Sequence, residues 1–368
     1  MRRFKAVLAV LLVIGVAMAG ATWGVFQLPA FGAAAEGARL ERMRKSPQFH
    51  GGRFENTPPY VSTLSFTREM KAWFGPEVRE PTFEVPVVRV PASDLQKPVQ
   101  PGLRATWLGH ASVLLEIDGV RIMTDPVLSR RTSPFQFIGP ARLHPAPLAL
   151  QDLANIDAVV ISHDHFDHLD MDTVRALARG GTHFYVGLGI GAHLERWGVP
   201  AAQVHDMDWW ERAEIKGVAI HCTPARHYSG RKRMDNSTLW SSWMIKGPRH
   251  AVYFSGDTGY AGHFKEVRER LGAPQLSLIK IGAYGDTWLD IHMSPESAVR
   301  AHQDLQAGAM LPVHWATFNL GYHAWEEPAV RAVAAAKANG VTLLTPRPGE
   351  KVEWGLPFSN EAWYLGAR

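Results

Sequence analysis

From residue 105 onward, short apolar runs alternate with polar turns, which is the pattern of a strand-rich domain. Residues 113–117 and 120–124 flank Asp118 and Gly119, a dipeptide typical of tight hairpin turns, so this stretch predicts two paired strands. Further strands are expected in the other apolar, β-rich runs, which are 158–161, 183–187, 218–222, 240–245, 251–254, 276–281, 310–313 and 341–344.

Apolar side chains recur at helical spacing between several of these runs. The predicted helices are 170–178, 262–271, 295–305 and 326–338. Two strand-rich halves separated by helices favour a layered α/β domain over an all-β barrel.

The first 102 residues have a different pattern. Residues 6–35 carry no charge, and residues 6–26 are apolar and long enough to cross about 30 Å of hydrocarbon as a helix. Arg2, Arg3 and Lys5 precede this run and favour a cytoplasmic amino end. We therefore expect residues 1–35 to be a membrane anchor or signal segment, and residues 36–102, rich in Pro, Gly and charge, to be an arm or linker.

Three interpretations of the amino-terminal run stay open: an uncleaved anchor, a signal cleaved near Ala17-Met18-Ala19, or a buried core helix. The first two place the rest of the chain outside the cytoplasm. The expected location is thus the bacterial cell envelope, with a membrane-anchored periplasmic or external domain, or export after signal cleavage.

Composition limits the chemistry of the domain. The 39 Lys and Arg against 35 Asp and Glu leave a net charge of +4, which gives no support to nucleic-acid binding. The one dense basic cluster after the first few residues, 231–233, fits either a solvated loop or a lipid-headgroup contact. With 17 His and 1 Cys, a metal site here must use imidazole and carboxylate rather than thiolate.

Potential metal ligands are concentrated between residues 163 and 170, directly after a predicted buried strand. They are His163, His165, Asp167, His168 and Asp170. Spacing divides them: His163 and His165 at the strand end can face one ion, and Asp167 with His168, entering the next helix, can face a second. Imidazole with carboxylate suits zinc or a neighbouring first-row metal.

Each ion needs further ligands from elsewhere in the chain. The candidates at the ends of β-rich runs are His227, Asp257 and His314. Taken singly, Asp257 also fits a turn residue before glycine, and the two histidines fit hydrogen-bonded core residues. Asp125 after a strand is expected to orient a ligand from the second shell, while His110 fits loop packing as well as support of a ligand.

The pattern His163-x-His165-x-Asp167-His168, followed by His227, Asp257 and His314, resembles the metallo-β-lactamase fold superfamily. Seven further segments resemble the N-acyl-phosphatidylethanolamine-hydrolysing phospholipase D family, and the likeness covers residues 55–355. These segments are 106–111, 124–126, 139–140, 208–211, 256–260, 281–284 and 314–318.

This resemblance implies a four-layer αββα sandwich over residues 103–368. It also implies two Zn²⁺ ions: His163, His165 and His227 hold one, Asp167, His168 and His314 hold the other, and Asp257 bridges them. A metal-bridging hydroxide would be the nucleophile, oriented by Asp167.

Two residues of this region keep alternative interpretations. His292 matches a histidine of the phospholipase family and could serve the leaving group, although a loop histidine near a helix start is the simpler interpretation. Lys280 departs from the family pattern and fits either a contact to the substrate phosphate or a lysine that snorkels from a strand edge.

The implied activity is hydrolysis of N-acyl-phosphatidylethanolamine-like phospholipids to phosphatidic acid and N-acylethanolamine, with membrane contact through the amino-terminal segment. Trp209, Trp210, Trp288 and Phe318 fit lipid contact or core packing, and Cys222 fits a small buried hydrophobe. Two alternatives stay open: a lactonase or soluble-metabolite phosphodiesterase on the same fold, and a non-catalytic zinc-binding envelope protein.

Overall fold

A computed structural model of the chain describes residues 2–60, 63 and 65–366. Two β-sheets form its centre. In spatial order, the first contains β15 (Lys351–Glu353), β3 (Leu103–Gly109), β4 (Ser112–Ile117), β5 (Val120–Thr124), β6 (Ala158–Ile161), β7 (His183–Gly187) and β8 (Val204–Met207). The second contains β14 (Ala309–Val313), β13 (Leu276–Lys280), β12 (Ala251–Phe254), β11 (Ser242–Lys246), β10 (Val218–Thr223) and β9 (Arg212–Ile215).

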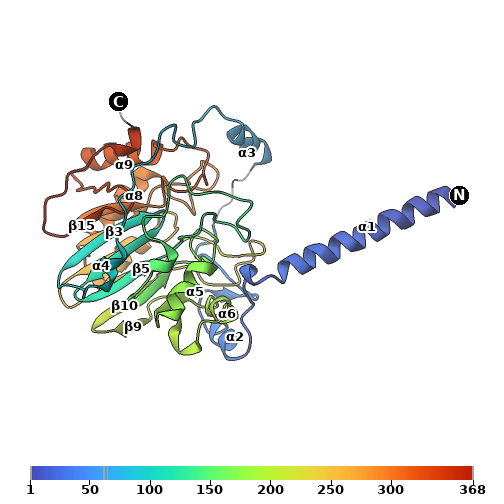
Figure 1. Cartoon of the computed structure of the whole chain (residues 1–368), viewed down its shortest axis with the longest axis horizontal. Helices are drawn as coiled ribbons and strands as arrows, with labels where there is room; N and C mark the ends of the chain where they lie inside the picture. The colour runs from blue at the N-terminus through green and yellow to red at the C-terminus, as the bar shows by residue number, and fades with distance from the viewer. Residues whose placement is uncertain (1, 61–62, 64, 367–368) are drawn as a thin grey trace.

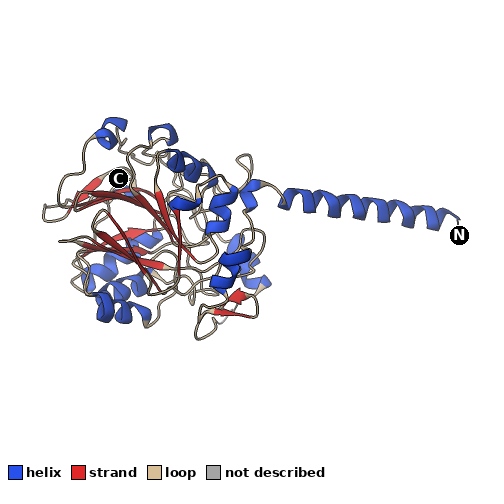
Figure 2. Ribbon diagram, turned by 90° about the horizontal axis from the view of Figure 1, so that it is seen from below, coloured by secondary structure: helices blue, strands red, loops and turns tan. Residues whose placement is uncertain are grey.

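The sheets stack face to face with helices on their outer sides (Figure 2). Alternation along β6 shows why: Ala158 and Val160 join the core between the sheets, whereas Val159 and Ile161 face the helices α5 (Met171–Arg179) and α6 (Gly191–Arg196). The helices α7 (His263–Leu271), α8 (Pro295–Leu305) and α9 (Glu327–Ala338) cover the second sheet. The expected αββα sandwich is confirmed.

Each half of the sandwich starts antiparallel and ends parallel. The expected hairpin of β4 and β5 turns through Asp118 and Gly119, which both have positive φ (48° and 93°), as a type I′ turn requires. From β5 to β8 and from β12 to β14 the neighbouring strands are parallel, so their carboxyl ends meet at one edge of each sheet. Ligands of open α/β sheets collect at such an edge.

The predicted strand at 341–344 is wrong. Leu343 forms only an isolated bridge to Met310, although hydrogen bonds from Met310 N to Thr342 O and from Leu344 N to Met310 O flank it. The pairing stops there because Pro346 has no N–H donor with which to extend a ladder.

The segment 36–102 packs on the domain as an arm. Its elements are α2 (Gly37–Met43), β1 (Phe49–His50), β2 (Arg53–Phe54), α3 (Phe66–Trp73) and α4 (Ala92–Gln96). Met43 and Phe54 are buried against Leu239 and Trp240 of the body. Four short 3₁₀ turns complete the secondary structure at Pro29–Phe31, Leu150–Asp152, Ala201–Gln203 and Trp363–Leu365.

The helix α1 (Arg2–Phe26) projects from the body on the side of α5 and α6 (Figure 1). The predicted basic flank of Arg2, Arg3 and Lys5 concerns side chains outside those that the structure describes. Over the described part of the chain, no helix has both the length and the hydropathy that crossing a membrane requires.

Candidate metal centre

The histidine-rich loop begins where β6 ends. His165, His168 and Leu169 form a compact turn, closed by hydrogen bonds to His165 O from His168 N (3.1 Å) and Leu169 N (2.9 Å). The prediction that Asp167 and His168 enter a helix is therefore wrong, because α5 starts only at Met171.

Asp170 explains where that helix starts. It is the N-cap of α5, accepting from Asp172 N, and it also accepts from Thr173 Oγ1 and Ser129 Oγ. Its carboxylate thus shapes the end of the loop and is not among the groups that converge on the cluster.

Three ring nitrogens form the first group of the centre, which we call the imidazole half. His163 Nε2 lies 2.8 Å from His165 Nδ1, and His227 Nε2 lies 3.4 Å from the same His165 atom. His227 follows β10 in the second sheet, so this group joins the two halves of the sandwich. All three donors could face one ion.

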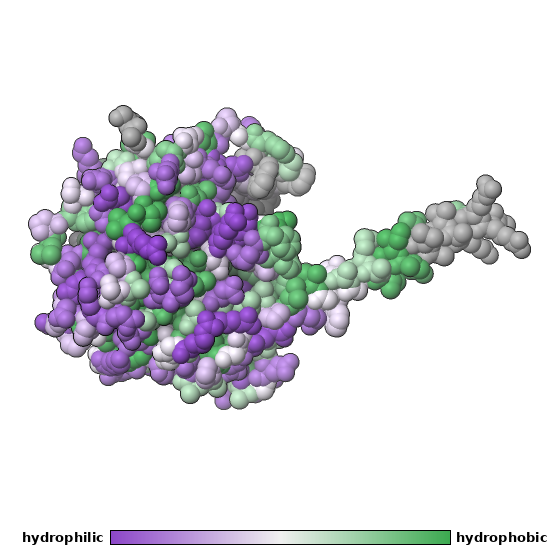
Figure 3. Space-filling view, in the orientation of Figure 1, coloured by the Kyte–Doolittle hydropathy of each residue, from purple (hydrophilic) through white to green (hydrophobic). Residues whose placement is uncertain are grey.

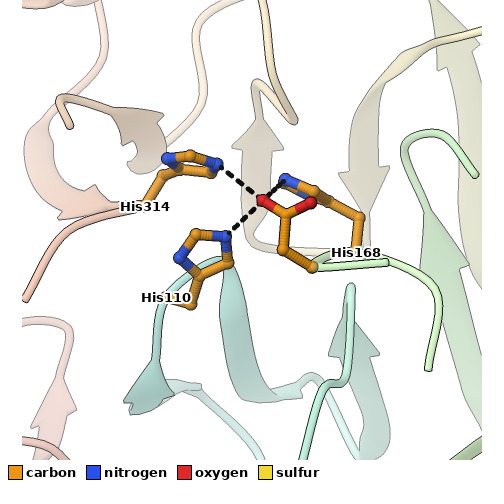
Figure 4. Close-up of side chains that lie close together, drawn as sticks. His110, His168 and His314 are labelled. Atoms are coloured by element: carbon orange, nitrogen blue, oxygen red, sulfur yellow. Dashed lines mark hydrogen bonds and ion pairs between the residues drawn. The ribbon is translucent and has the colours of Figure 1, made fainter. Parts of the chain in front are cut away.

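The second group gathers around the carboxylate of Asp167, and we call Asp167, His168 and His314 the carboxylate half. Asp167 Oδ2 lies 3.3 Å from His168 Nε2 and 3.3 Å from His314 Nε2. His110 Nε2 approaches the same oxygen at 3.0 Å (Figure 4). The three histidines come from three separate loops and point at one oxygen atom.

Asp257 connects the two groups. Its Oδ2 lies 3.1 Å from His314 Nε2, 3.4 Å from His168 Nε2 and 3.9 Å from His227 Nε2. One carboxylate oxygen thus lies near donors of both halves, as a bridging ligand must.

Hydrogen bonds outside the cluster fix which ring nitrogen each histidine turns inward. His168 Nδ1 donates to Asp125 Oδ2 (2.6 Å), and His227 Nδ1 donates to Ile291 O (3.2 Å). Ser162 Oγ donates to Asp125 and therefore accepts from His163 Nδ1 at 2.9 Å. In each case Nε2 stays free for the cluster, which is the usual arrangement around ligating histidines.

His292 lies at the rim of the cluster. Its Nδ1 donates to Ala283 O (2.8 Å), which turns Nε2 toward Asp257 Oδ2 at 3.5 Å. The ring centroid of His292 is 5.0 Å from that of His227. The structure therefore brings the candidate for the leaving group together with the candidate ligands.

Several residues of the centre hold strained backbone conformations. His110, Asp125 and His314 have φ angles of 52°, 33° and 63°. Positive φ angles are unfavourable for residues other than glycine. Such conformations persist where the surrounding contacts over-determine them, and they concentrate at functional sites.

Burial and neighbouring charges set the protonation of the cluster. Burial, and then the charge of His168, hold the pKa of His163 well below its usual 6.5, and burial lowers the pKa of His227 in the same direction. Burial would raise the pKa of Asp167, but the charge of His168 and hydrogen bonds from the surrounding histidines hold it well below 3.8. His168 differs: burial would lower its pKa, but the charges of Asp167 and Asp257 raise it well above 6.5, so the metal-free centre holds His168 as a cation. Neutral imidazoles and ionised carboxylates are the forms that bind metal ions, so binding at His168 would release its proton.

The donor set fits a pair of metal ions. His168 Nε2, His314 Nε2 and Asp257 Oδ1 are buried and make no hydrogen bond of good geometry among the described residues, although the two ring nitrogens lie 3.3 Å from Asp167 Oδ2. Unpartnered buried polar atoms are costly, and here they point into a group of imidazoles and carboxylates. Nitrogen and oxygen donors without thiolate suit zinc and its first-row neighbours.

Sequence reasoning left three supporting residues unassigned or open. His110 both packs in its loop, accepting at its backbone O from His314 N, and holds Asp167. Asn56 of the arm pairs with the backbone of His227 through Asn56 Nδ2 to His227 O (2.7 Å) and His227 N to Asn56 Oδ1 (3.2 Å). Ser162 was visible only as a neighbour of His163, without a pattern to mark its role.

Lys280 does not snorkel to the surface as one interpretation expected. It is fully buried, and its Nζ donates to Gly282 O at 2.7 Å. Burial lowers the pKa of Lys280 to about 8, against the opposing charges of Asp257 and Asp167. Lys280 therefore adds a positive charge that interacts with the carboxylates of Asp257 and Asp167.

The aromatic candidates divide into two pairs. The ring centroid of Phe318 lies 5.3 Å from that of His110, and Trp288 Nε1 donates to Ala283 O at 2.9 Å. Both side chains therefore border the centre. Trp209 and Trp210 pack against the hydrophobic core instead. Cys222 is fully buried between the sheets, as expected of a small hydrophobe.

Comparisons with known proteins show the family to which the chain belongs. The family described as "Beta-lactamase superfamily domain" matches residues 120–315. An uncharacterized protein of Mycobacterium tuberculosis is 43% identical over 87% of this chain and 88% of its own length. N-acyl-phosphatidylethanolamine-hydrolyzing phospholipase D 1 of Caenorhabditis elegans is 38% identical over 64% of this chain and 70% of its own length.

A solved structure shows the same fold. The metallo hydrolase Igni18 of Ignicoccus hospitalis superposes with a TM-score of 0.55 at 26% identity, covering 69% of this chain and 99% of its own.

Proposed function

Because this chain belongs to the metallo-β-lactamase superfamily, we propose that it is a two-zinc phosphodiesterase of the phospholipase D type, acting on N-acyl-phosphatidylethanolamine-like lipids. The chain is a metal-dependent hydrolase. The observation that carries the proposal is the position of Asp257 Oδ2, within 3.9 Å of donors from both halves of the centre.

Two zinc ions bound here would polarise a phosphoryl oxygen and lower the pKa of a water molecule toward neutrality. The protein's own part is to hold the donors rigid. His110 fixes the carboxylate of Asp167, and Asp125 fixes the ring of His168. Asp167 is then placed to ligate and to orient the attacking water.

His292 is the residue we assign to the leaving group. Burial, and then the charge of Lys280, hold the pKa of His292 well below 6.5, so its Nε2 is unprotonated near neutral pH. Nε2 would take up the proton that the attacking water releases and pass it to the leaving alkoxide. Since Nδ1 is committed to Ala283 O, the exchangeable site is the nitrogen that faces the cluster. His292→Ala should lower the rate without releasing zinc, which metal analysis beside kinetics would establish. Lost zinc would contradict this role.

The lipid substrate class rests on the relatives and on the amino-terminal helix. Relatives from C. elegans and Saccharomyces cerevisiae carry the name of a phospholipase D that hydrolyses N-acyl-phosphatidylethanolamine. The apolar helix α1 would keep the domain at the bacterial envelope membrane, where such a lipid lies.

The test is purified, metal-analysed protein assayed against N-acyl-phosphatidylethanolamine, phosphatidylcholine, a lactone panel and bis-nitrophenyl phosphate. Release of phosphatidic acid from the first lipid supports the proposal. Cleavage of lactones alone would favour a lactonase on the same fold, and no turnover of any substrate by the metal-loaded protein would favour the non-catalytic envelope protein.

A further inference from the structure

The segment that follows α1 is tied to the body. We call residues 27–33 the strap. Trp197 Nε1 donates to Pro29 O (2.7 Å), Arg231 Nε donates to Ala30 O (2.9 Å), and Ala33 N donates to His193 Nδ1 (3.0 Å). A side chain at Gly32 would lie 2.1 Å from the ring of His193, so the strap fits closely. It therefore fixes where α1 leaves the domain.

The side chains that hold the strap also hold the histidine-rich loop, residues 162–170, which we call the metal-binding loop. Arg231 Nη1 donates to Asp164 O (2.7 Å) and to Leu169 O (2.9 Å), one near each end of the loop. His193 Nε2 lies 3.3 Å from Asp164 Oδ2. Helix α1 is thus attached directly beside the residues that bind the metal.

An apolar surface spreads outward from this attachment. The ring centroid of Phe31 in the strap lies 6.1 Å from that of Phe166 and 6.3 Å from that of Phe135. Phe166 stands between His165 and Asp167 in the sequence. Phe135 in turn lies 5.3 Å from Phe137, whose side chain is 80% exposed, and Ile138 beside it is 59% exposed. We call the surface formed by Phe26, Leu28, Phe135, Phe137 and Ile138 the platform.

We propose that the platform docks on a lipid bilayer, so that the metal-binding loop faces the membrane surface from which substrate is taken. The substrate part of this inference rests on the proposed function, whereas the docking does not. Large apolar side chains with little cover mark an interaction surface, and here they surround the root of an apolar helix.

Two observations favour a bilayer over a protein partner. First, the successive residues Leu11, Leu12 and Val13 of α1 are each more than half exposed, so the helix offers apolar side chains on every face rather than on one stripe. In the space-filling view, the coloured part of this helix is green over much of its length and pale nearer the body (Figure 3).

Second, basic residues lie beside the platform. Arg130 precedes the platform loop, and Lys232 and Arg233 follow the Arg231 that holds the strap. All three are exposed. Cations next to apolar residues complement anionic headgroups, which attract basic side chains near the membrane surface.

The chain offers a direct test of the docking. Its single cysteine, Cys222, is fully buried, so a nitroxide label attached to the full-length variant Phe137→Cys would report on position 137 alone. Leu356→Cys is a matched control, because Leu356 is 62% exposed and follows β15 on the far side of the body from α1 (Figure 1).

Both labelled proteins would be reconstituted in vesicles of phosphatidylethanolamine and phosphatidylglycerol. The label at 137 should collide more with oxygen, which dissolves in lipid, than with a water-soluble nickel complex, and the label at 356 should show the reverse. Equal nickel access at both positions would overturn the docking. Dipolar coupling between labels at 137 would do so as well, because it would show that a second copy of the chain covers the platform.

Turnover adds a separate readout. Phe137→Ser should lower the ratio of vesicle-lipid turnover to bis-nitrophenyl phosphate turnover by about tenfold. Partial burial of one phenylalanine side chain in the bilayer contributes a binding free energy that corresponds to a factor of about this size. Leu356→Ser should leave the ratio unchanged. An unchanged ratio for Phe137→Ser would overturn the docking, whereas absence of lipid turnover in the parent protein would contradict the proposed function and leave the label measurement decisive.

Discussion

The two halves of the metal centre are supported by different parts of the molecule. The carboxylate half depends on residues that belong to the strand ends of the first sheet, Asp125 after β5 and His110 after β3. The imidazole half has a further support outside the sheets, since Asn56 of the arm holds the backbone of His227. Arg231 donates to Asp164 O and Leu169 O and so holds the loop that carries ligands of both halves.

Strand ends of the sandwich therefore position ligands of both halves, and the arm adds a support for His227 in the imidazole half. A ligand anchored by sheet geometry needs no further segment, because parallel strands bring their carboxyl ends together. A ligand anchored by an arm depends on that arm being docked.

Asp257→Asn should damage both halves at once. The change removes the negative charge that donors of both halves share, so metal content should fall in both and turnover should drop on the order of 10⁴-fold, the scale of losing a member of a catalytic unit. Asp94→Asn on the remote helix α4 is the control. An Asp257→Asn protein that keeps its metal ions and its turnover would refute the bridging position.

Asp167→Asn should lose most turnover with the fold intact, because the neutral amide is a weaker ligand and a weaker acceptor for water. The loss should be confined to the carboxylate half, so one metal ion per chain should remain. Metal analysis, circular dichroism and kinetics on one preparation would show this. Retained activity in the metal-replete variant would count against the assignment.

Asp125→Asn should weaken metal binding in the carboxylate half by about 10- to 100-fold, as loss of a partner to a ligating histidine does elsewhere. The ring of His168 would lose its anionic acceptor, which lies at 2.6 Å. Competition with a chromophoric chelator would resolve the two affinities. A smaller weakening is expected in the imidazole half, because Asp125 also holds Ser162, which accepts from His163 Nδ1. Equal weakening of both would mean that Asp125 does not support the carboxylate half preferentially.

Asn56→Ala should have the opposite selectivity and a smaller effect, weakening metal binding in the imidazole half by about tenfold. It removes two hydrogen bonds that hold the backbone of His227, each contributing roughly 1 kcal/mol. The same titration measures it. A loss of metal affinity confined to the carboxylate half would show that Asn56 does not support the imidazole half.

Lys280→Met should change the pH dependence of stability in the metal-free protein. The folded chain releases the Lys280 proton near pH 8, whereas the unfolded chain keeps it to about pH 10.5. Since the unfolded state then binds more protons, the stability of the parent relative to Lys280→Met should rise between these values, by up to about 3 kcal/mol. Denaturant unfolding at pH 7.5 and 10 measures this. Parallel pH profiles would show that Lys280 is not held with a lowered pKa.

Much of the centre could be predicted from the sequence because its ligands follow local signals. His163, Asp257 and His314 each follow a short apolar run, and the structure places these runs in β6 of the first sheet and in β12 and β14 of the second. The hairpin at Asp118 was likewise predictable, since the dipeptide alone selects its turn.

What could not be predicted depends on contacts between distant segments. Asn56 lies 171 residues from His227, and Ala33 lies 160 residues from His193, so no local pattern marks either pair. Burial of Lys280 was missed for a related reason: a single lysine in an apolar run does not show whether its strand lies at an edge or in the middle of a sheet, and β13 lies between β12 and β14.

A zinc titration of the metal-free protein tests whether the two halves form one two-zinc centre. Phosphatidic acid release from N-acyl-phosphatidylethanolamine would be followed at each addition. Two half-sites joined by Asp257 predict little release at one equivalent of zinc per chain and full release as the second binds. Full activity at one equivalent, or none at two, would contradict the account.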